Sequence, residues 1–88
     1  MNFNPENQKP EIDYPCDWQY KIIGTNVDDM IVAIEEIATG FEYEITPSNV
    51  STNEKYFSLN LKVFVPSEII RDLIFQKLEK HLAIKFVI

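Results

Sequence analysis

Residues 55–65 read KYFSLNLKVFV, and this stretch decides the fold because its side chains alternate strictly between two faces. One face is apolar and carries Phe57, Leu59, Leu61, Val63 and Val65. The other face is mixed and carries Tyr56, Ser58, Asn60, Lys62 and Phe64. Alternation with a period of two is typical of a β-strand that buries one face. A strand this apolar on one side is expected in the centre of a sheet.

The residues that follow predict a helix and a last strand. Pro66 ends the central strand, and Ser67 can cap a helix over residues 68–80. The helix side chains expected toward the core are Ile69, Ile70, Leu73, Ile74 and Leu78. Residues 82–88, LAIKFVI, predict a closing strand.

The residues that precede the central strand predict a strand at the edge of the sheet. Residues 42–46, EYEIT, alternate again and direct Tyr43 and Ile45 inward. Pro47 has no N–H group to donate to a strand ladder, so this strand should lie at an edge.

The first half of the chain predicts a strand followed by a helix. Residues 17–25, DWQYKIIGT, alternate and place Trp18, Tyr20 and Ile22 on one face, as in a half-buried strand. Asn26 can cap the helix, and Gly40 can end it. The apolar stripe of this helix consists of Met30, Ile31, Ile34, Ile37 and Ala38.

The order strand, helix, strand, strand, helix, strand predicts an α+β fold. Right-handed crossovers and a hairpin between the second and third strands give a four-stranded antiparallel sheet with strand order 4-1-3-2. Both helices should cover one face of this sheet, which is a ferredoxin-like βαββαβ sandwich. Residues 1–15 contain three prolines and many polar side chains, and we expect them to form a flexible arm. Residues 16–88 should form a single domain.

The composition argues against several classes of partner and cofactor. A formal net charge of −6 and a pI near 4.6 disfavour nucleic acid and anionic membranes. Residues 1–10 lack the apolar run of a signal peptide, and no apolar stretch approaches the ~20 residues that span a bilayer, so we expect a cytoplasmic protein. No metal-binding or cofactor-binding motif occurs, and neither a metal nor a cofactor is expected.

The chain is poor in the side chains that carry catalysis. Cys16 is the only cysteine and His81 the only histidine. His81 near a helix end is expected to act as a cap, and Cys16 has no histidine nearby in the sequence to activate it. Because no nucleophile–base pair can be assembled from these two residues, the sequence predicts a protein that is not an enzyme.

Three stretches resemble the YbeD-like family of small bacterial proteins, a domain of unknown function. These are residues 14–24, YPCDWQYKIIG, residues 51–62, STNEKYFSLNLK, and the apolar ending at residues 82–88. The resemblance implies a ferredoxin-like fold similar to the ACT regulatory domains of amino-acid metabolism. In ACT domains the ligand contacts the turn after the first strand, which implies Gly24, Thr25 and Asn26 as ligand-binding residues here.

Acidic residues dominate the middle of the chain. Residues 22–54 contain seven acids and no lysine or arginine. Because the first helix and the second strand are joined directly through Gly40, we expect most of these acids to share one side of the molecule. The partner-binding candidates on this acidic face are Glu35, Glu36, Glu42 and Glu44. The alternative is that these charges serve solubility and protect an exposed edge strand.

The sequence therefore predicts a small non-catalytic regulatory or adaptor protein that binds a protein partner. The alternative prediction is an ACT-like domain that senses a small molecule through the turn at residues 24–26. The identity of the partner and the pathway are not contained in the sequence, and a homodimer is left open.

Overall fold

The computed structural model describes residues 12–48 and 55–88, and these form four strands and two helices. The strands are β1 (Cys16–Gly24), β2 (Tyr43–Pro47), β3 (Phe57–Val65) and β4 (Phe86–Val87), and the helices are α1 (Val27–Ala38) and α2 (Glu68–Lys80). Most of the predicted arm, residues 1–11, and residues 49–54 lie outside the described residues.

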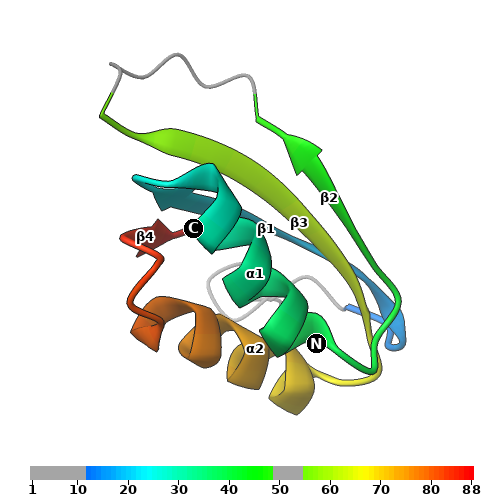
Figure 1. Ribbon diagram of the computed structural model, residues 1–88. Coiled ribbons are helices and arrows are strands. Elements are labelled where there is room, and N and C mark those ends of the chain that lie inside the picture. The colour runs from blue at the N-terminus through cyan, green and yellow to red at the C-terminus, as the bar shows by residue number, and fades with distance from the viewer. Residues whose placement is uncertain (1–11, 49–54) are drawn as a thin grey trace, which may run out of the picture.

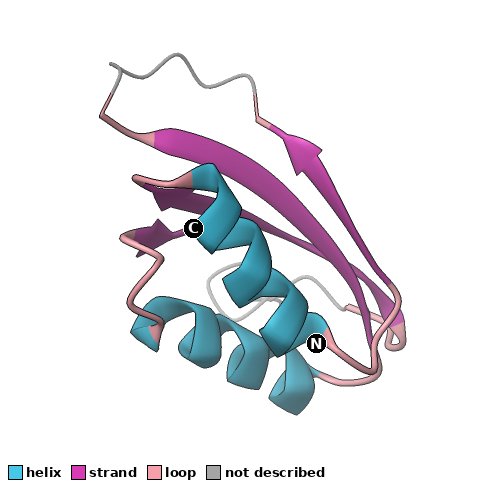
Figure 2. Ribbon diagram, in the orientation of Figure 1, coloured by secondary structure: helices cyan, strands magenta, loops and turns pink. Residues whose placement is uncertain are grey.

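The four strands form one antiparallel sheet in the order β2-β3-β1-β4. This order is the predicted 4-1-3-2 read from the opposite edge, so the ferredoxin-like α+β fold is confirmed. Figure 1 shows β2 at one edge of the sheet and the short β4 at the other. Both helices cover the same face, which leaves the other face open (Figure 2). Pro47 ends the edge strand β2, where its missing N–H costs no ladder bond.

Both helices begin at the predicted caps. The Asn26 side-chain oxygen accepts the N–H of Asp29 at 3.0 Å, and the Ser67 hydroxyl accepts the N–H of Ile70 at 3.3 Å. These bonds satisfy N–H groups that have no partner within the first helical turn. Gly40 follows α1 with a φ of +93°, a backbone conformation that side chains disfavour, and so it ends the helix as predicted.

The core lies between the helices and the inner face of the sheet. The sheet contributes Tyr20, Ile22, Leu59, Leu61, Val63 and Val65, and the helices contribute Met30, Ala33, Ile34, Ile74 and Leu78. All of these side chains are buried, so the alternation along residues 55–65 identified most of the inner face correctly.

Four apolar side chains that the sequence directs inward are instead exposed, and one of them is Tyr43 of the edge strand β2, which is 38% exposed. Ile69 is 79% exposed and Leu73 is 42% exposed, because α2 turns the side that carries Ile70, Ile74 and Leu78 toward the sheet. Ile69 and Leu73 are four residues apart and therefore share the outward side of the helix. Phe57 is 43% exposed, since it lies at the very start of β3.

The predicted closing strand is shorter than the sequence indicates. Within residues 82–88, only Phe86 and Val87 are in a strand, and Leu82 is 96% exposed. The preceding residues form a turn in which the N–H of Ile84 donates to the His81 carbonyl at 3.1 Å. This turn buries Ile84 in the core and delays the start of the strand.

The contacts of the domain begin before the predicted boundary at residue 16. Tyr14 packs against the core, and its hydroxyl accepts a hydrogen bond of 2.9 Å from Arg71 of α2.

Within residues 12–48 and 55–88, neither helix has the length and apolar character that crossing a membrane requires.

Candidate functional site

The open face of the sheet carries the charged residues of the candidate site. Lys62 of β3 lies opposite Glu44 of β2 on one side and opposite Gln19 of β1 on the other. Since neighbouring residues across a sheet project to the same face, these three side chains form a row on the face away from the helices. The next row along the sheet is formed by Glu42, Phe64 and Asp17, because Phe64 bonds to the Glu42 carbonyl and pairs with Asp17.

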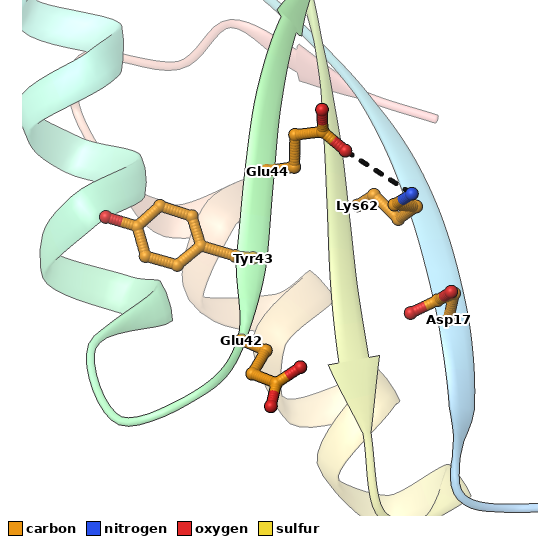
Figure 3. Close-up of a pocket in the computed structure, with 5 residues that line it drawn as sticks. All are labelled: Asp17, Glu42, Tyr43, Glu44 and Lys62. Carbon is orange, nitrogen blue, oxygen red and sulfur yellow. Dashed lines mark ion pairs between the residues drawn. The ribbon is translucent and has the colours of Figure 1, made fainter.

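Together these rows form a surface that we call the acidic patch, defined as Asp17, Glu42 and Glu44 around Lys62 and Phe64. The charged residues of the patch border a shallow hollow of about 290 Å³. Figure 3 shows Glu44 directed at Lys62, while Tyr43 projects from the other side of the β2 ribbon. The patch therefore combines three carboxylates, one ammonium and an exposed ring.

The charges of the acidic patch stay accessible to solvent. The Glu44 carboxylate and the Lys62 ammonium are 3.3 Å apart, with 61% and 48% of their side chains exposed. A pair this exposed contributes little to stability, typically about 0–1 kcal/mol. Asp17 and Glu42 are also exposed, and among the described residues neither carboxylate forms an ion pair, so a partner can contact both charges.

The structure does not place the four predicted glutamates on one face. Glu42 and Glu44 lie on the open face of the sheet, whereas Glu35 and Glu36 belong to α1, which covers the opposite face. Glu36 instead approaches His81 beyond the end of α2, with 3.5 Å between its Oε1 and the imidazole Nε2. The expected single acidic face is thus corrected to two separate groups of carboxylates.

Asp17 is the member of the acidic patch that was missing from the candidates. It lies at the start of β1, far from β2 in sequence, and reaches the patch only because β1 and β2 both flank β3. The sequence could have identified Asp17 as a member of the patch. The predicted strand order places β1 and β2 on either side of β3, and the alternation of residues 17–25 directs Asp17 away from Trp18 and Tyr20.

The turn after β1 is filled by the chain itself. Gly24 is buried, and a Cβ at this position would lie 2.7 Å from the Ala83 carbonyl oxygen and 2.8 Å from the Met30 sulfur. Thr25 is exposed, and the Asn26 side chain is engaged in the α1 cap. The absence of a side chain at Gly24 therefore allows Ala83 and Met30 to pack closely against β1. Ligand binding by residues 24–26 stays a prediction, and the space beside Gly24 is filled by these two residues.

His81 and Cys16 lie near opposite ends of the sheet. The His81 N–H donates to the Leu78 carbonyl at 3.2 Å, and its Nδ1 accepts the N–H of Ala83 at 3.1 Å, so His81 caps α2 as predicted. Ala83 adjoins Gly24, the last residue of β1, whereas Cys16 is the first residue of that nine-residue strand. Strands rise about 3.3 Å per residue, so the thiol and the imidazole lie too far apart to act together. Within the described part of the chain, no three His, Cys, Asp or Glu residues converge on a position for a metal ion.

Comparison with known proteins places the chain in a family. The model of a protein family of unknown function, DUF493, matches residues 9–88. The chain belongs to the DUF493 family. Among its relatives, an uncharacterized protein of Helicobacter pylori strain J99 is 36% identical over 75 residues, covering 83% of this chain and 85% of the relative. The uncharacterized protein Cj0253 of Campylobacter jejuni is 38% identical over 79 residues, covering 90% and 91%.

A third relative of this chain confirms the resemblance to the YbeD-like family. It is a UPF0250 protein of Hahella chejuensis, 29% identical over 87 residues, covering 94% of this chain and 96% of the relative. Among solved structures, the solution structure of protein HP0495 from H. pylori has a TM-score of 0.79 at 28% identity and covers 100% of this chain and 97% of that one. This chain therefore shares its fold with HP0495.

Proposed function

We propose that this DUF493 protein is a small non-catalytic adaptor or regulatory protein that binds a basic segment of a protein partner on its acidic patch. The observation that carries the proposal is the placement of three carboxylates from two non-adjacent strands around an exposed ring on the uncovered face of the sheet. Within residues 12–48 and 55–88, both helices lie on the other face of the sheet, so neither helix covers this face.

The arrangement suits a lysine or arginine side chain. Phe64 is 43% exposed and lies between Glu42 and Asp17 in its row. A cation placed over such a ring gains about 0.5–1 kcal/mol at an exposed site, and the flanking carboxylates add Coulomb attraction. A neighbouring basic side chain of the same segment would compete with Lys62 for Glu44. Contacts of this kind give fast, salt-sensitive and weak binding, as expected for an adaptor.

The competing explanation is that the charges protect β2 from pairing with other chains. β2 is the edge strand beside the patch, and charged side chains and proline are common protection for such edges. Under this explanation, partner binding would not depend on Glu42 and Glu44. The ACT-like alternative finds no comparable support, since Gly24 is packed against Ala83 and Met30.

The structure provides a matched pair of variants that separates these explanations. Glu42→Lys/Glu44→Lys reverses the patch, whereas Glu35→Lys/Glu36→Lys makes the same change of net charge on the helical side. All four residues are exposed, so both variants should fold. Each variant and the wild type should be used as bait at low salt in extract of the cells that produce the protein.

We expect the wild type and Glu35→Lys/Glu36→Lys to capture the same proteins. Glu42→Lys/Glu44→Lys should capture them about tenfold less well or worse, because reversing the charges turns electrostatic steering into repulsion. Capture by the wild type should also weaken as salt rises. Equal recovery with all three baits would contradict the proposal and leave protection of the β2 edge as the role of these charges.

A further inference from the structure

The strand ladder on the outer side of β1 stops halfway along the strand. β1 has nine residues, but β4 pairs only with Ile22 and Ile23. The last bonds of this ladder join Lys21 and Ile88, at 3.0 Å and 2.9 Å. Among the described strands, none pairs with residues 16–20 of β1 on this side.

The alternation of backbone groups shows which ones face this uncovered edge. The Lys21 N–H and C=O and the Ile23 C=O all bond toward the β4 side. In an antiparallel ladder every second residue directs its N–H and C=O to the same neighbour. The backbone groups of Gln19 and Asp17 therefore face outward in line with β4, as an edge that can accept another strand.

A groove lies beside this edge. It has a volume of about 360 Å³ and is lined by Trp18, Gln19, Tyr20, Phe75, Ile88 and the pair formed by Arg71 and Asp72. Trp18 and Tyr20 project to the helical side of β1, whereas Gln19 projects to the open side. Because residues from both faces line it, the groove lies at the edge of the sheet, where the ladder ends.

The floor of the groove is held in place. The Arg71 guanidinium lies 4.4 Å from the centre of the Trp18 ring and 3.0 Å from the Asp72 carboxylate. Arg71 Nη1 also donates to the Tyr14 hydroxyl at 2.9 Å, and the buried Tyr20 hydroxyl donates to the Arg71 carbonyl at 2.7 Å. A site that is already ordered loses less conformational entropy when it binds.

We propose that this groove receives an extended, uncharged segment of a partner protein, which adds to β1 in line with β4 and antiparallel to β1. The segment would pair with the backbone of Gln19 and place one large apolar side chain against Trp18 and Phe75. The extended form follows from the continuity of the site with the β1–β4 ladder. The lack of charge follows because the charges that line the groove, Arg71 and Asp72, already neutralise each other. Strand addition of this kind takes affinity from main-chain bonds and specificity from side-chain pockets.

The edge that this site uses lies across the sheet from β2, although β1 also contributes Asp17 to the acidic patch. The edge of β2 provides a matched control. Glu42 and Ser48 bond toward β3, so the backbone of Tyr43 faces outward from β2 as that of Gln19 does from β1. Proline at either position removes an N–H that no described strand accepts.

The experiment uses a phage-displayed library of random octapeptides, selected on the immobilised full chain. We expect the recovered peptides to alternate apolar and polar residues without net charge. Gln19→Pro should weaken their binding about tenfold or more, because the added strand loses a backbone bond and meets the proline ring. Tyr43→Pro should bind them as the wild type does.

Amide hydrogen exchange on the wild type tests the same point without relying on a proline variant. A recovered peptide should slow exchange of the Gln19 amide about tenfold and leave the Tyr43 amide unchanged. Recovered peptides that bind Gln19→Pro normally and leave the Gln19 amide unprotected would overturn the proposal, as would a failure to recover any peptide. Self-association of the wild type that Gln19→Pro abolishes would also overturn it, by making a second copy of this chain the occupant.

Discussion

Replacing Gly24 by alanine should destabilise the protein, and the structure indicates by how much. The new Cβ would lie 2.7 Å from the Ala83 carbonyl oxygen and 2.8 Å and 2.9 Å from two atoms of the Met30 side chain. The Met30 side chain can move, but the Ala83 oxygen belongs to the backbone. The segment that contains Ala83 is held in place because the Lys85 N–H donates to the Ile23 carbonyl at 2.8 Å. Relief of the clash therefore requires the segment that leads into β4 to shift.

The cost can be estimated from two opposing effects. Overpacking a filled interior typically costs about 1–3 kcal/mol. A glycine-to-alanine change gains about 0.4–1 kcal/mol, because it restricts the unfolded chain. We expect Gly24→Ala to lower the free energy of unfolding by about 1–2 kcal/mol, which for a domain of this size lowers the Tm by roughly 5–15 °C.

Urea unfolding followed by the fluorescence of the only tryptophan, Trp18, would measure this change. Gly40→Ala is the control, because no atom lies within 4 Å of a Cβ there and only its φ of +93° opposes the substitution. Amide exchange near Lys85 should accelerate in Gly24→Ala and stay unchanged in Gly40→Ala. A Gly24→Ala variant as stable as the wild type would refute the argument and reopen the turn at residues 24–26 as a ligand site.

Two further predictions concern the core. Leu61→Ala should lower the free energy of unfolding by about 2–5 kcal/mol, because Leu61 is fully buried in the central strand; a loss below about 1 kcal/mol in urea unfolding would contradict this assignment. Burial raises the pKa of the Tyr20 phenol to about 12, although Arg71 partly lowers it. An unfolded tyrosine loses its proton near pH 10, so between pH 10 and 12 the folded state holds a proton that the unfolded state has lost. The free energy of unfolding should therefore fall in this range as the pH rises, by up to about 1.4 kcal/mol per pH unit. Tyr20→Phe should lack this component of the decline, which parallel urea titrations of both proteins at pH 9 to 12 would reveal.

The order of the elements could be predicted because each signal had a single structural meaning. The alternation of residues 55–65 and the proline at position 47 fixed a central strand and an edge strand, and Asn26 and Ser67 fixed the start of each helix. The exposed positions of Ile69 and Leu73 could not be read in this way. Six apolar residues on α2 cover more than one side of the helix, and only packing against the sheet decides which side is buried.

The candidate site was half predictable. The alternation of residues 42–46 directs Tyr43 and Ile45 inward, so it also predicts that Glu42 and Glu44 point away from the helices. The link through Gly40 wrongly suggested that they share a side with Glu35 and Glu36. By contrast, the closure of the turn by Ala83 depends on where a distant segment comes to rest against Gly24, which no local pattern encodes.

The pairing of β1 with β3 has a consequence for how the acidic patch assembles. β2 and β3 are neighbours in the sequence, but the pairs between β1 and β3 run from Gly24 with Phe57 to Cys16 with Val65, across the whole of α1 and β2. Contacts between distant segments require a large loop to close first, so they form late relative to a hairpin. Glu42 and Glu44 are therefore brought beside Lys62 by a local event, whereas Asp17 joins them only when β1 docks. A partner that needs all three carboxylates would therefore bind the folded protein and would not bind the chain before β1 has paired with β3.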